Sequence, residues 1–224
     1  MSSLRRHDVI DVDALQRAAL RRILEAAARA IRERGRFRIV LAGGETPRGV
    51  YRMLRTANTA WSGWQIHFGD ERCLPREDAE RNSRMTGLVW LDHVPIPVAQ
   101  VHTIPAELGA ERAAAVYATH LQGVGDFDLV LLGLGEDGHT AGLFPGHDWG
   151  DAPGAPDVLA VLDAPKPPPQ RVSLSAMRLS RSREVLFLVA GPSKRAALAR
   201  WRAGEQIPAR AIRPAAGVDV LVTG

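Results

Sequence analysis

The first part of the chain alternates amphipathic helical patterns with short apolar runs. Within residues 12–34 apolar side chains recur every three or four positions, which predicts a long amphipathic helix that ends at Gly35. The run FRIVLAGG (37–44) is almost continuously apolar and ends in glycines, as buried parallel strands often do. Thr46, followed by proline, suits the cap of a helix over 46–56. The pattern therefore predicts helix, strand, tight turn and helix.

The same alternation continues along the chain. Further strands are predicted at 64–71, 127–135 and 183–191, and further helices at 109–122 and 192–204. Alternating strands and helices indicate an α/β fold with a mainly parallel central sheet and helices on both faces. We expect residues 1–224 to form a single domain. The stretch 145–169, rich in Pro, Gly and Asp, is interpreted as a surface excursion with one strand over 158–162.

Composition narrows the possible functions. The net charge is +4, but acidic and basic residues are interspersed, so an anionic small molecule is a better expected partner than nucleic acid. Cys73 is the only cysteine, which excludes an internal disulfide and fits a reducing compartment. We find no signal-peptide pattern and no run of eighteen apolar residues. We therefore expect a cytoplasmic protein with no membrane partner.

A glycine-rich turn, AGGETPRG (42–49), links the first predicted strand to the next helix. Backbone N–H groups at such a helix start attract anions, and Gly43 and Gly44 would let a phosphate approach the backbone closely. Thr46 can donate its hydroxyl, and Arg48 lies on the first helical turn. The four residues are candidate phosphate ligands, although the same composition also suits a simple tight turn.

Asp70, Glu71 and Arg72 directly follow a predicted strand. In an open parallel sheet, ligands bind beyond the carboxyl ends of the strands, so these side chains lie where a site is expected. Arg72 can make two parallel hydrogen bonds to an anion, and Asp70 is a candidate substrate contact. The alternative is a solvated cluster of ion pairs.

The segment GLGEDG (133–138) has the glycine spacing of a dinucleotide-binding loop. That loop must open a long helix, whereas here Pro145 follows after only a few residues, which argues against a dinucleotide cofactor. His139 instead stands at the carboxyl end of a strand, where it could accept a proton near neutral pH. Asp137 could orient the imidazole or bind turn amides.

The other titratable candidates carry less weight. No second histidine stands at ligand spacing from His139, so we expect no catalytic metal. Lys194, one of only two lysines, lies at a helix start after the strand over 183–191 and could pair with a phosphate. The remaining histidines are interpreted as packing or surface residues: His7, His67, His93, His102, His120 and His147.

Taken together, these segments resemble the 6-phosphogluconolactonase family in order along most of the chain. The matching segments are LAGGETPRGVYRML, WQIHFGDERCLPREDAERNSRM, FDLVLLGLGEDGHTAGLFPG, PKPPPQRVSLS and EVLFLVAGPSKRAAL. The resemblance implies a modified Rossmann-like fold of the glucosamine-6-phosphate deaminase and ribose-5-phosphate isomerase type. It also implies cofactor-free hydrolysis of 6-phospho-D-glucono-1,5-lactone to 6-phosphogluconate in the oxidative pentose phosphate pathway, by a monomer or small homo-oligomer.

The resemblance assigns roles to the candidate residues. His139 matches the general base of the family, Arg72 its substrate-binding arginine and Lys194 a further anion contact. The phosphate loop matches Gly43, Gly44 and Thr46. A lactone needs water to be deprotonated beside its carbonyl and a positive group near the developing oxyanion. Arg72 could stabilise that oxyanion or hold the phosphate.

The chain departs from the family pattern at three positions. Glu45 and Gly142 each stand where a serine is usual, and Ser180 stands where an asparagine is common. Glu45 would place a carboxylate near the phosphate unless its side chain points away. Two other functions fit the same fold: an aminosugar-phosphate deaminase or isomerase, and a non-catalytic phosphosugar-binding protein. The former usually carries F-N-E-P after the histidine turn, whereas this chain has LFPG.

Overall fold

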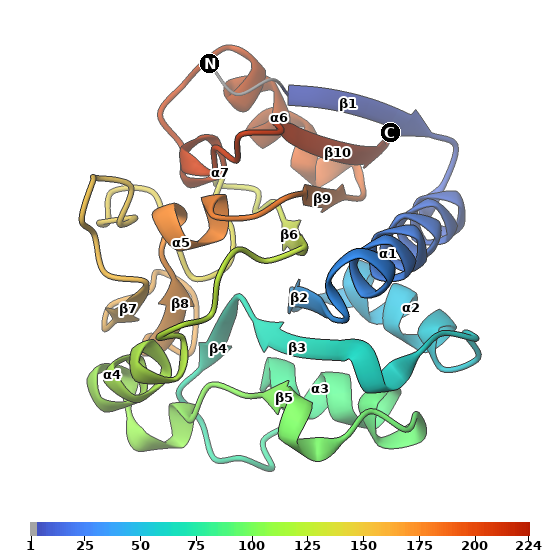
Figure 1. The fold of residues 1–224 in the computed structure, drawn as a ribbon. Coiled ribbons are helices and arrows are strands. Elements are labelled where there is room, and N and C mark those ends of the chain that lie inside the picture. The colour runs from blue at the N-terminus through green and yellow to red at the C-terminus, as the bar shows by residue number, and fades with distance from the viewer. Residues whose placement is uncertain (1–3) are drawn as a thin grey trace.

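The computed structural model describes residues 4–224, and its centre is a seven-stranded sheet (Figure 1). In spatial order the strands are β1 (Leu4–Val9), β10 (Val218–Thr223), β9 (Val185–Val189), β6 (Leu129–Gly133), β2 (Phe37–Leu41), β3 (Trp64–Phe68) and β5 (Val101–His102). All neighbouring strands run parallel. The mainly parallel sheet confirms the predicted fold class.

A second, smaller sheet is antiparallel and was not predicted. It contains β4 (Asp70–Arg72), β8 (Arg171–Leu174) and β7 (Val158–Val161), in the order β4-β8-β7. The single strand predicted over 64–71 is therefore wrong at its end, because the chain changes sheets at Gly69. The Gly69 N–H donates to Leu41 O in the large sheet at 3.0 Å, and Gly69 O accepts from Leu174 N at 2.8 Å in the small one.

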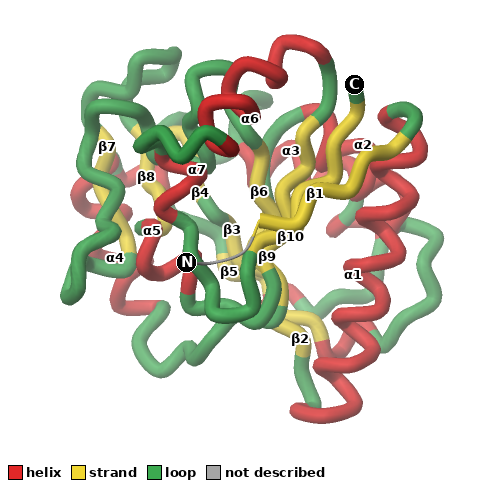
Figure 2. The backbone as a smooth tube through the Cα atoms, turned by 90° about the horizontal axis from the view of Figure 1, so that it is seen from above, coloured by secondary structure: helices red, strands yellow, loops and turns green. Residues whose placement is uncertain are grey.

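Seven α-helices occur within residues 4–224. They are α1 (Val12–Arg34), α2 (Glu45–Leu54), α3 (Asn82–Val89), α4 (Ala110–His120), α5 (Ala176–Ser180), α6 (Arg195–Arg202) and α7 (Pro208–Ala211). Seen from above, α1 and α2 lie on one side of the large sheet, and the small sheet lies with α4 and α5 on the other (Figure 2). None of the helices within residues 4–224 is long and apolar enough to cross a bilayer.

The ends of α1 follow the predicted pattern, whereas the start of α2 does not. Asp11 accepts a hydrogen bond from the backbone N–H of Ala14, and Gly35 ends α1 with φ at 71°, in the left-handed region that suits glycine. The cap predicted at Thr46 is wrong, because α2 begins at Glu45 and Gly44 is its N-cap. Gly44 has φ at 102°, which only glycine adopts easily, so the turn closes earlier than a side-chain cap would allow.

Candidate active site

A cavity of about 350 Å³ lies at the carboxyl ends of the central strands. Strand ends, the helix α2 and the small sheet all contribute to its wall. Seven of the residues predicted from the sequence line it: Gly43, Gly44, Thr46, Asp70, Arg72, His139 and Lys194. Asp137 and Arg48 are not among its lining residues; Asp137 lies behind His139, and Arg48 is turned toward Glu45. The topology thus brings together segments that are up to 150 positions apart.

The glycine-rich turn is held close to its neighbours. A Cβ on Gly43 would lie 2.1 Å from Asn82 Oδ1, so no larger residue fits there without displacing the asparagine. The buried hydroxyl of Tyr51 donates to Ala42 O at 2.8 Å and accepts from Ala42 N at 3.0 Å. Because both backbone groups of Ala42 are used by one side chain, the end of β2 is fixed beside the cavity.

The carboxylate of Glu45 has a partner within the same helix. Its Oε1 accepts a hydrogen bond from Arg48 Nη1 at 2.9 Å, and the Glu45 side chain is 79% exposed. The concern that Glu45 would repel a phosphate is therefore reduced, since an arginine balances its charge. The same pairing occupies one nitrogen of Arg48.

Glu71 anchors the segment that carries Asp70 and Arg72. Its carboxylate is fully buried and accepts the backbone N–H of Arg72 at 3.0 Å and that of Asn82 at 2.7 Å. The N–H and hydroxyl of Ser83 donate to the same carboxylate at 2.9 and 2.6 Å. Arg81 lies 3.4 Å away and is also buried. Glu71 is thus a structural residue that fixes β4 against the start of α3, a role that the sequence did not distinguish.

Asp70 lies between cationic and amide groups at the wall of the cavity. Asn82 Nδ2 donates to its Oδ1 at 3.1 Å and to its backbone oxygen at 3.0 Å. Burial raises the pKa of the Asp70 carboxyl, while the positive charges of Arg72 and Arg171 oppose that shift. Asn82 also lines the cavity and was not predicted as a site residue, although it belongs to the quoted N-S-R-M segment.

The turn after β6 presents His139 to the cavity. Its Nδ1 lies 2.5 Å from Asp137 Oδ1, and because an ionised carboxylate only accepts, Nδ1 carries the proton and Nε2 is left with its lone pair. A Cβ on Gly135 would lie 2.0 Å from His139 Nδ1, so this glycine makes room for the ring. Gly138 has φ at 92°. The glycine spacing therefore serves a tight turn that positions an imidazole.

The surroundings of His139 favour its neutral form. Burial lowers the pKa of the imidazole, and the hydrogen bond and charge of Asp137 partly offset that shift. The positive charges of Lys166 and Arg171 lower the pKa further. The ring also packs on Phe144, with 5.0 Å between ring centroids. Although burial alone would raise the pKa of Asp137, its hydrogen bond with His139 lowers it, so the carboxylate stays ionised.

Arg171 is the main cavity residue that the sequence did not single out. It is 5% exposed, lies 5.4 Å from the centre of the Phe144 ring, and lines the cavity. Its Nη2 donates to the backbone oxygens of Lys166 at 3.1 Å and Pro167 at 3.0 Å, which ties the proline-rich segment to the site. The segment PKPPPQRVSLS pointed to this region, but only the pairing of β8 with β4 shows that its arginine lies opposite Arg72 and near enough to Asp70 for their charges to interact.

Lys194 and Gly142 lie at or near the cavity and contact neighbouring segments. Lys194 Nζ lies 3.8 Å from Glu136 Oε1 at the cavity edge. Gly142, where the family usually has serine, donates its N–H to Ser173 Oγ at 3.1 Å, and a Cβ there would lie 2.9 Å from Ser173 Cβ. The glycine thus lets two segments approach closely. Within residues 4–224, no three His, Cys, Asp or Glu side chains are grouped so as to hold a metal ion.

The fold is that of an α/β protein with a mainly parallel sheet, and its cavity lies at the carboxyl edge of that sheet, where open α/β sheets commonly bind ligands. A model of the family "Glucosamine-6-phosphate isomerases/6-phosphogluconolactonase" matches residues 10–221, and the chain belongs to this family. Within the family, its similar relatives include 6-phosphogluconolactonases. That of Mycobacterium leprae is 36% identical over 92% of this chain and 87% of its own length, and that of Synechocystis is 38% identical over 92% and 90%.

Solved structures of related proteins have the same fold as this chain. The crystal structure of 6-phosphogluconolactonase from Thermotoga maritima has a TM-score of 0.91, with 26% identity over 99% of this chain and all of the other. A monomeric glucosamine-6-phosphate deaminase has a TM-score of 0.83, with 21% identity over 98% and 97%, which shows a common fold only. The resemblance found in the sequence motifs is therefore confirmed.

Proposed function

We propose that this protein hydrolyses 6-phospho-D-glucono-1,5-lactone to 6-phosphogluconate, with His139 as the general base. The observation that carries the proposal is the His139–Asp137 pair, at 2.5 Å, facing a cavity that also contains Arg72, Arg171 and Lys194. Similarity to 6-phosphogluconolactonases over most of the chain supports the same activity. The reaction belongs to the oxidative pentose phosphate pathway.

In the proposed mechanism, His139 Nε2 removes a proton from water as the water oxygen attacks the lactone carbonyl. Asp137 holds the ring by its Nδ1 proton and stabilises the imidazolium that forms. The tetrahedral intermediate then collapses, the bond between the carbonyl carbon and the ring oxygen breaks, and the imidazolium returns the proton to that oxygen. The open-chain carboxylic acid loses a proton to solvent at neutral pH. No step requires a cofactor or a metal.

The anionic parts of the substrate are assigned to the cationic and backbone donors of the cavity. The N–H groups of the 43–46 turn, with Lys194, are proposed to hold the phosphate. Arg72 and Arg171 supply two further guanidinium groups to the cavity, near Asp70. We assign Arg72 to the developing oxyanion, because its segment is fixed by Glu71 and a preorganised donor is most effective there.

An aminosugar-phosphate deaminase or isomerase is the nearest alternative. Such an enzyme usually supplies a glutamate from an F-N-E-P turn after its histidine. In this protein that turn is LFPG, and the carboxylates among the described lining residues are those of Glu45 and Asp70. Glu45 is paired with Arg48. This arrangement favours the lactonase over the aminosugar enzyme, and the His139–Asp137 pair at the cavity favours an enzyme over a non-catalytic binding protein.

The remaining expectations belong to the same proposal. We infer that residues 1–224 act as one domain, supported by a continuous cluster of buried side chains that joins both sheets. A cytoplasmic location is supported by the free thiol of Cys73. A monomer or small homo-oligomer is expected, and sedimentation velocity would show it directly.

The decisive experiment measures hydrolysis of freshly generated 6-phosphogluconolactone by the purified protein, corrected for spontaneous hydrolysis. Glucosamine 6-phosphate is the parallel substrate. We expect turnover of the lactone and none of the aminosugar. Turnover of glucosamine 6-phosphate alone would overturn the proposal in favour of a deaminase, and turnover of neither would favour a binding protein.

A further inference from the structure

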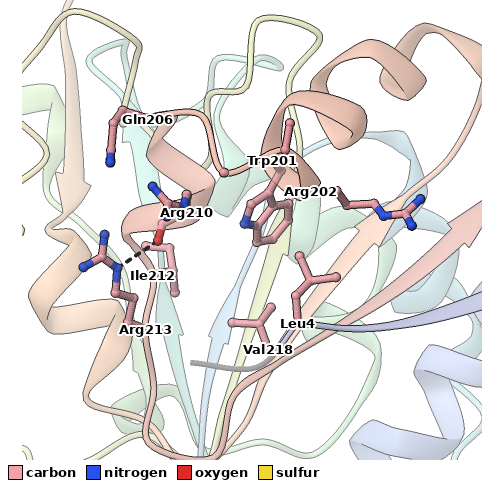
Figure 3. Close-up of a pocket in the computed structure, with 10 residues that line it drawn as sticks. Leu4, Trp201, Arg202, Gln206, Arg210, Ile212, Arg213 and Val218 are labelled. Atoms are coloured by element: carbon pink, nitrogen blue, oxygen red, sulfur yellow. Dashed lines mark hydrogen bonds between the residues drawn. The ribbon is translucent and has the colours of Figure 1, made fainter. Parts of the chain in front are cut away.

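A second hollow lies beside α6 (Figure 3). Its volume is about 780 Å³, more than twice that of the active-site cavity, and the two share no lining residue. We call it the α6 groove and define it by four apolar and three basic residues: Leu4, Trp201, Ile212 and Val218, with Arg202, Arg210 and Arg213. None of the steps proposed above for lactone hydrolysis uses a residue of the α6 groove.

The floor of the α6 groove is apolar and well packed. Trp201, Ile212 and Val218 are 6%, 2% and 3% exposed. The Trp201 ring packs edge-on against Phe187 of β9, with 4.6 Å between ring centroids. Trp201 lies above Leu4 and Val218 in the close-up (Figure 3). These packed side chains leave only a small accessible apolar surface, which is rigid and so loses little entropy when a ligand binds.

Arg210 and Arg213 form one wall of the groove, whereas Arg202 extends away from them (Figure 3). Arg213 Nε donates to Arg210 O at 3.1 Å, and the Arg213 N–H donates to Ser180 Oγ at 2.8 Å. The Arg210 guanidinium lies near Gly204, where an added Cβ would be 3.7 Å from Arg210 Nη2. The wall is therefore held by its backbone while both guanidinium groups keep free donors.

The charges of this wall are not balanced by the protein. Among residues 4–224, no carboxylate forms an ion pair with Arg210 or Arg213. Glu205, the acidic residue nearest to Arg210 in the sequence, is instead paired with Arg200 at 2.8 Å, and Asp219, the nearest to Arg213, is paired with Arg5 at 2.7 Å. An anion bound at this wall would accept charge-assisted hydrogen bonds from these guanidinium groups.

We propose that the α6 groove binds a small organic polyanion, with at least two negative charges and a flat apolar group, of the size of a nucleotide. The charged end would lie on Arg210 and Arg213, and the apolar group on the floor beside Trp201. A volume of about 780 Å³ suits a ligand larger than the sugar phosphate that the active-site cavity of about 350 Å³ would hold. Because the two hollows share no lining residue, both ligands can be bound together.

The test uses isothermal titration calorimetry with three probes: ATP, inorganic tripolyphosphate and adenosine. Excess 6-phosphogluconate fills the active site throughout. The titrations compare the wild-type protein with the double variant R210A/R213A and with the control R32A/R36A, which removes the same charge from exposed arginines at the end of α1. Thermal unfolding of each variant checks its fold.

We expect ATP to bind the wild-type protein more tightly than either of the other probes. The double variant should bind ATP about tenfold more weakly or worse, while the control changes by about twofold at most. Lactone hydrolysis should be equal in all three proteins.

Four results would overturn the proposal. One is an absence of ATP binding to the wild-type protein at millimolar concentration, and another is an equal loss in the control, which would indicate non-specific attraction. Tripolyphosphate binding as tightly as ATP would remove the role of the apolar floor. Adenosine binding as tightly as ATP would remove the role of the arginines.

Discussion

His139 and His67 both belong to segments that include a strand of the large parallel sheet, but only His139 lines the active-site cavity. His139 follows β6, its side chain is 22% exposed, and Asp137 holds its Nδ1. His67 lies within β3, is 1% exposed, and stacks on His102 with 4.6 Å between ring centroids. Its Nδ1 is buried and has no hydrogen-bond partner among the described residues.

Burial lowers the pKa of both histidines, but the consequences differ. At His139 a carboxylate partly offsets the effect of burial, so the imidazole can accept a proton during a reaction. At His67 burial has the largest effect, and the charges of His102, His120 and nearby arginines lower the pKa further, well below its ordinary value. A buried histidine without a carboxylate remains neutral and acts as a packing residue. Access to the cavity and a carboxylate partner, rather than burial, distinguish His139, the proposed base, from His67.

The largest expected effect comes from His139→Ala. Loss of the proposed base should lower kcat/KM for lactone hydrolysis by about 10²- to 10⁴-fold, with the fold retained because the side chain is partly exposed. The matched control is His147→Ala, a histidine of the same segment that pairs with Asp163. Steady-state kinetics should show the control near wild type. Equal losses in the two variants would remove the assignment of His139.

Arg72→Ala should have the next largest effect. Removing a guanidinium from the cavity should lower kcat/KM by about 10- to 100-fold, since a charge-assisted hydrogen bond contributes about 1.5–3 kcal/mol. A fall carried by kcat supports the oxyanion assignment, whereas a rise in KM alone contradicts it. Arg76→Ala is the control, because Arg76 is exposed and pairs with Glu107 outside the cavity.

Asp137→Asn tests the partner of His139. We expect kcat to fall by about tenfold, because an amide holds the ring less well than a carboxylate. Asp137 raises the pKa of His139, so its removal should lower that pKa further. Since the neutral imidazole is the active form, the acid limb of the kcat/KM–pH profile should move to lower pH. An acid limb that moves to higher pH would show that the pair does not act as assigned.

His67→Phe should have the smallest effect, and on stability rather than activity. The pKa of His67 is lowered in the folded state, so the unfolded chain binds more protons below pH 6.5, and stability is lost as the pH falls. Phenylalanine cannot be protonated, so the variant should lose less Tm than the wild-type protein between pH 8 and pH 5. Each kcal/mol of unfolding free energy that the variant keeps at pH 5 should appear as about 2–4 °C of Tm. Thermal unfolding at both pH values measures it. An unchanged difference would show that His67 does not contribute to acid sensitivity.

His102 has to be considered in the same measurement. Burial lowers its pKa to about 4, and the charge of His120 lowers it in the same direction. His102 therefore adds its own loss of stability between pH 6.5 and about pH 4. The variant His67→Phe removes only one of these contributions, so part of the acid sensitivity should remain.

The chemistry-bearing turns could be predicted from the sequence because each is encoded locally. Gly43, Gly44 and Gly138 mark turns that a larger side chain or an ordinary φ would not permit, and His139 follows the last of them directly. The long helix over 12–34 was predicted with its exact end because its apolar spacing and Gly35 lie in one continuous segment. Local spacing also predicted β2, β3, β6 and β9. It missed β10 (Val218–Thr223), although all six of its residues are buried and most are apolar.

Other elements carry weaker local signals. β1 is largely exposed and charged, and β5 has only two residues, so neither shows the apolar run of a central strand. β8 was hidden in a proline-rich stretch. These elements form because neighbouring strands provide their hydrogen bonds, and such partners cannot be inferred from short-range periodicity.

The sequence by itself determined the class of fold and the types of catalytic group, because periodicity and turn residues act over a few positions. Only the tertiary structure decided which of these groups face one cavity. The switch of sheets at Gly69 pairs β4 with β8 and so brings Arg171 beside Asp70, about 100 positions away in the chain. The tertiary structure also gathers the α6 groove from segments that are separate in the chain: Leu4, residues 201–213 and Val218. Contacts of this kind depend on strand order and side-chain packing, which local patterns leave undetermined.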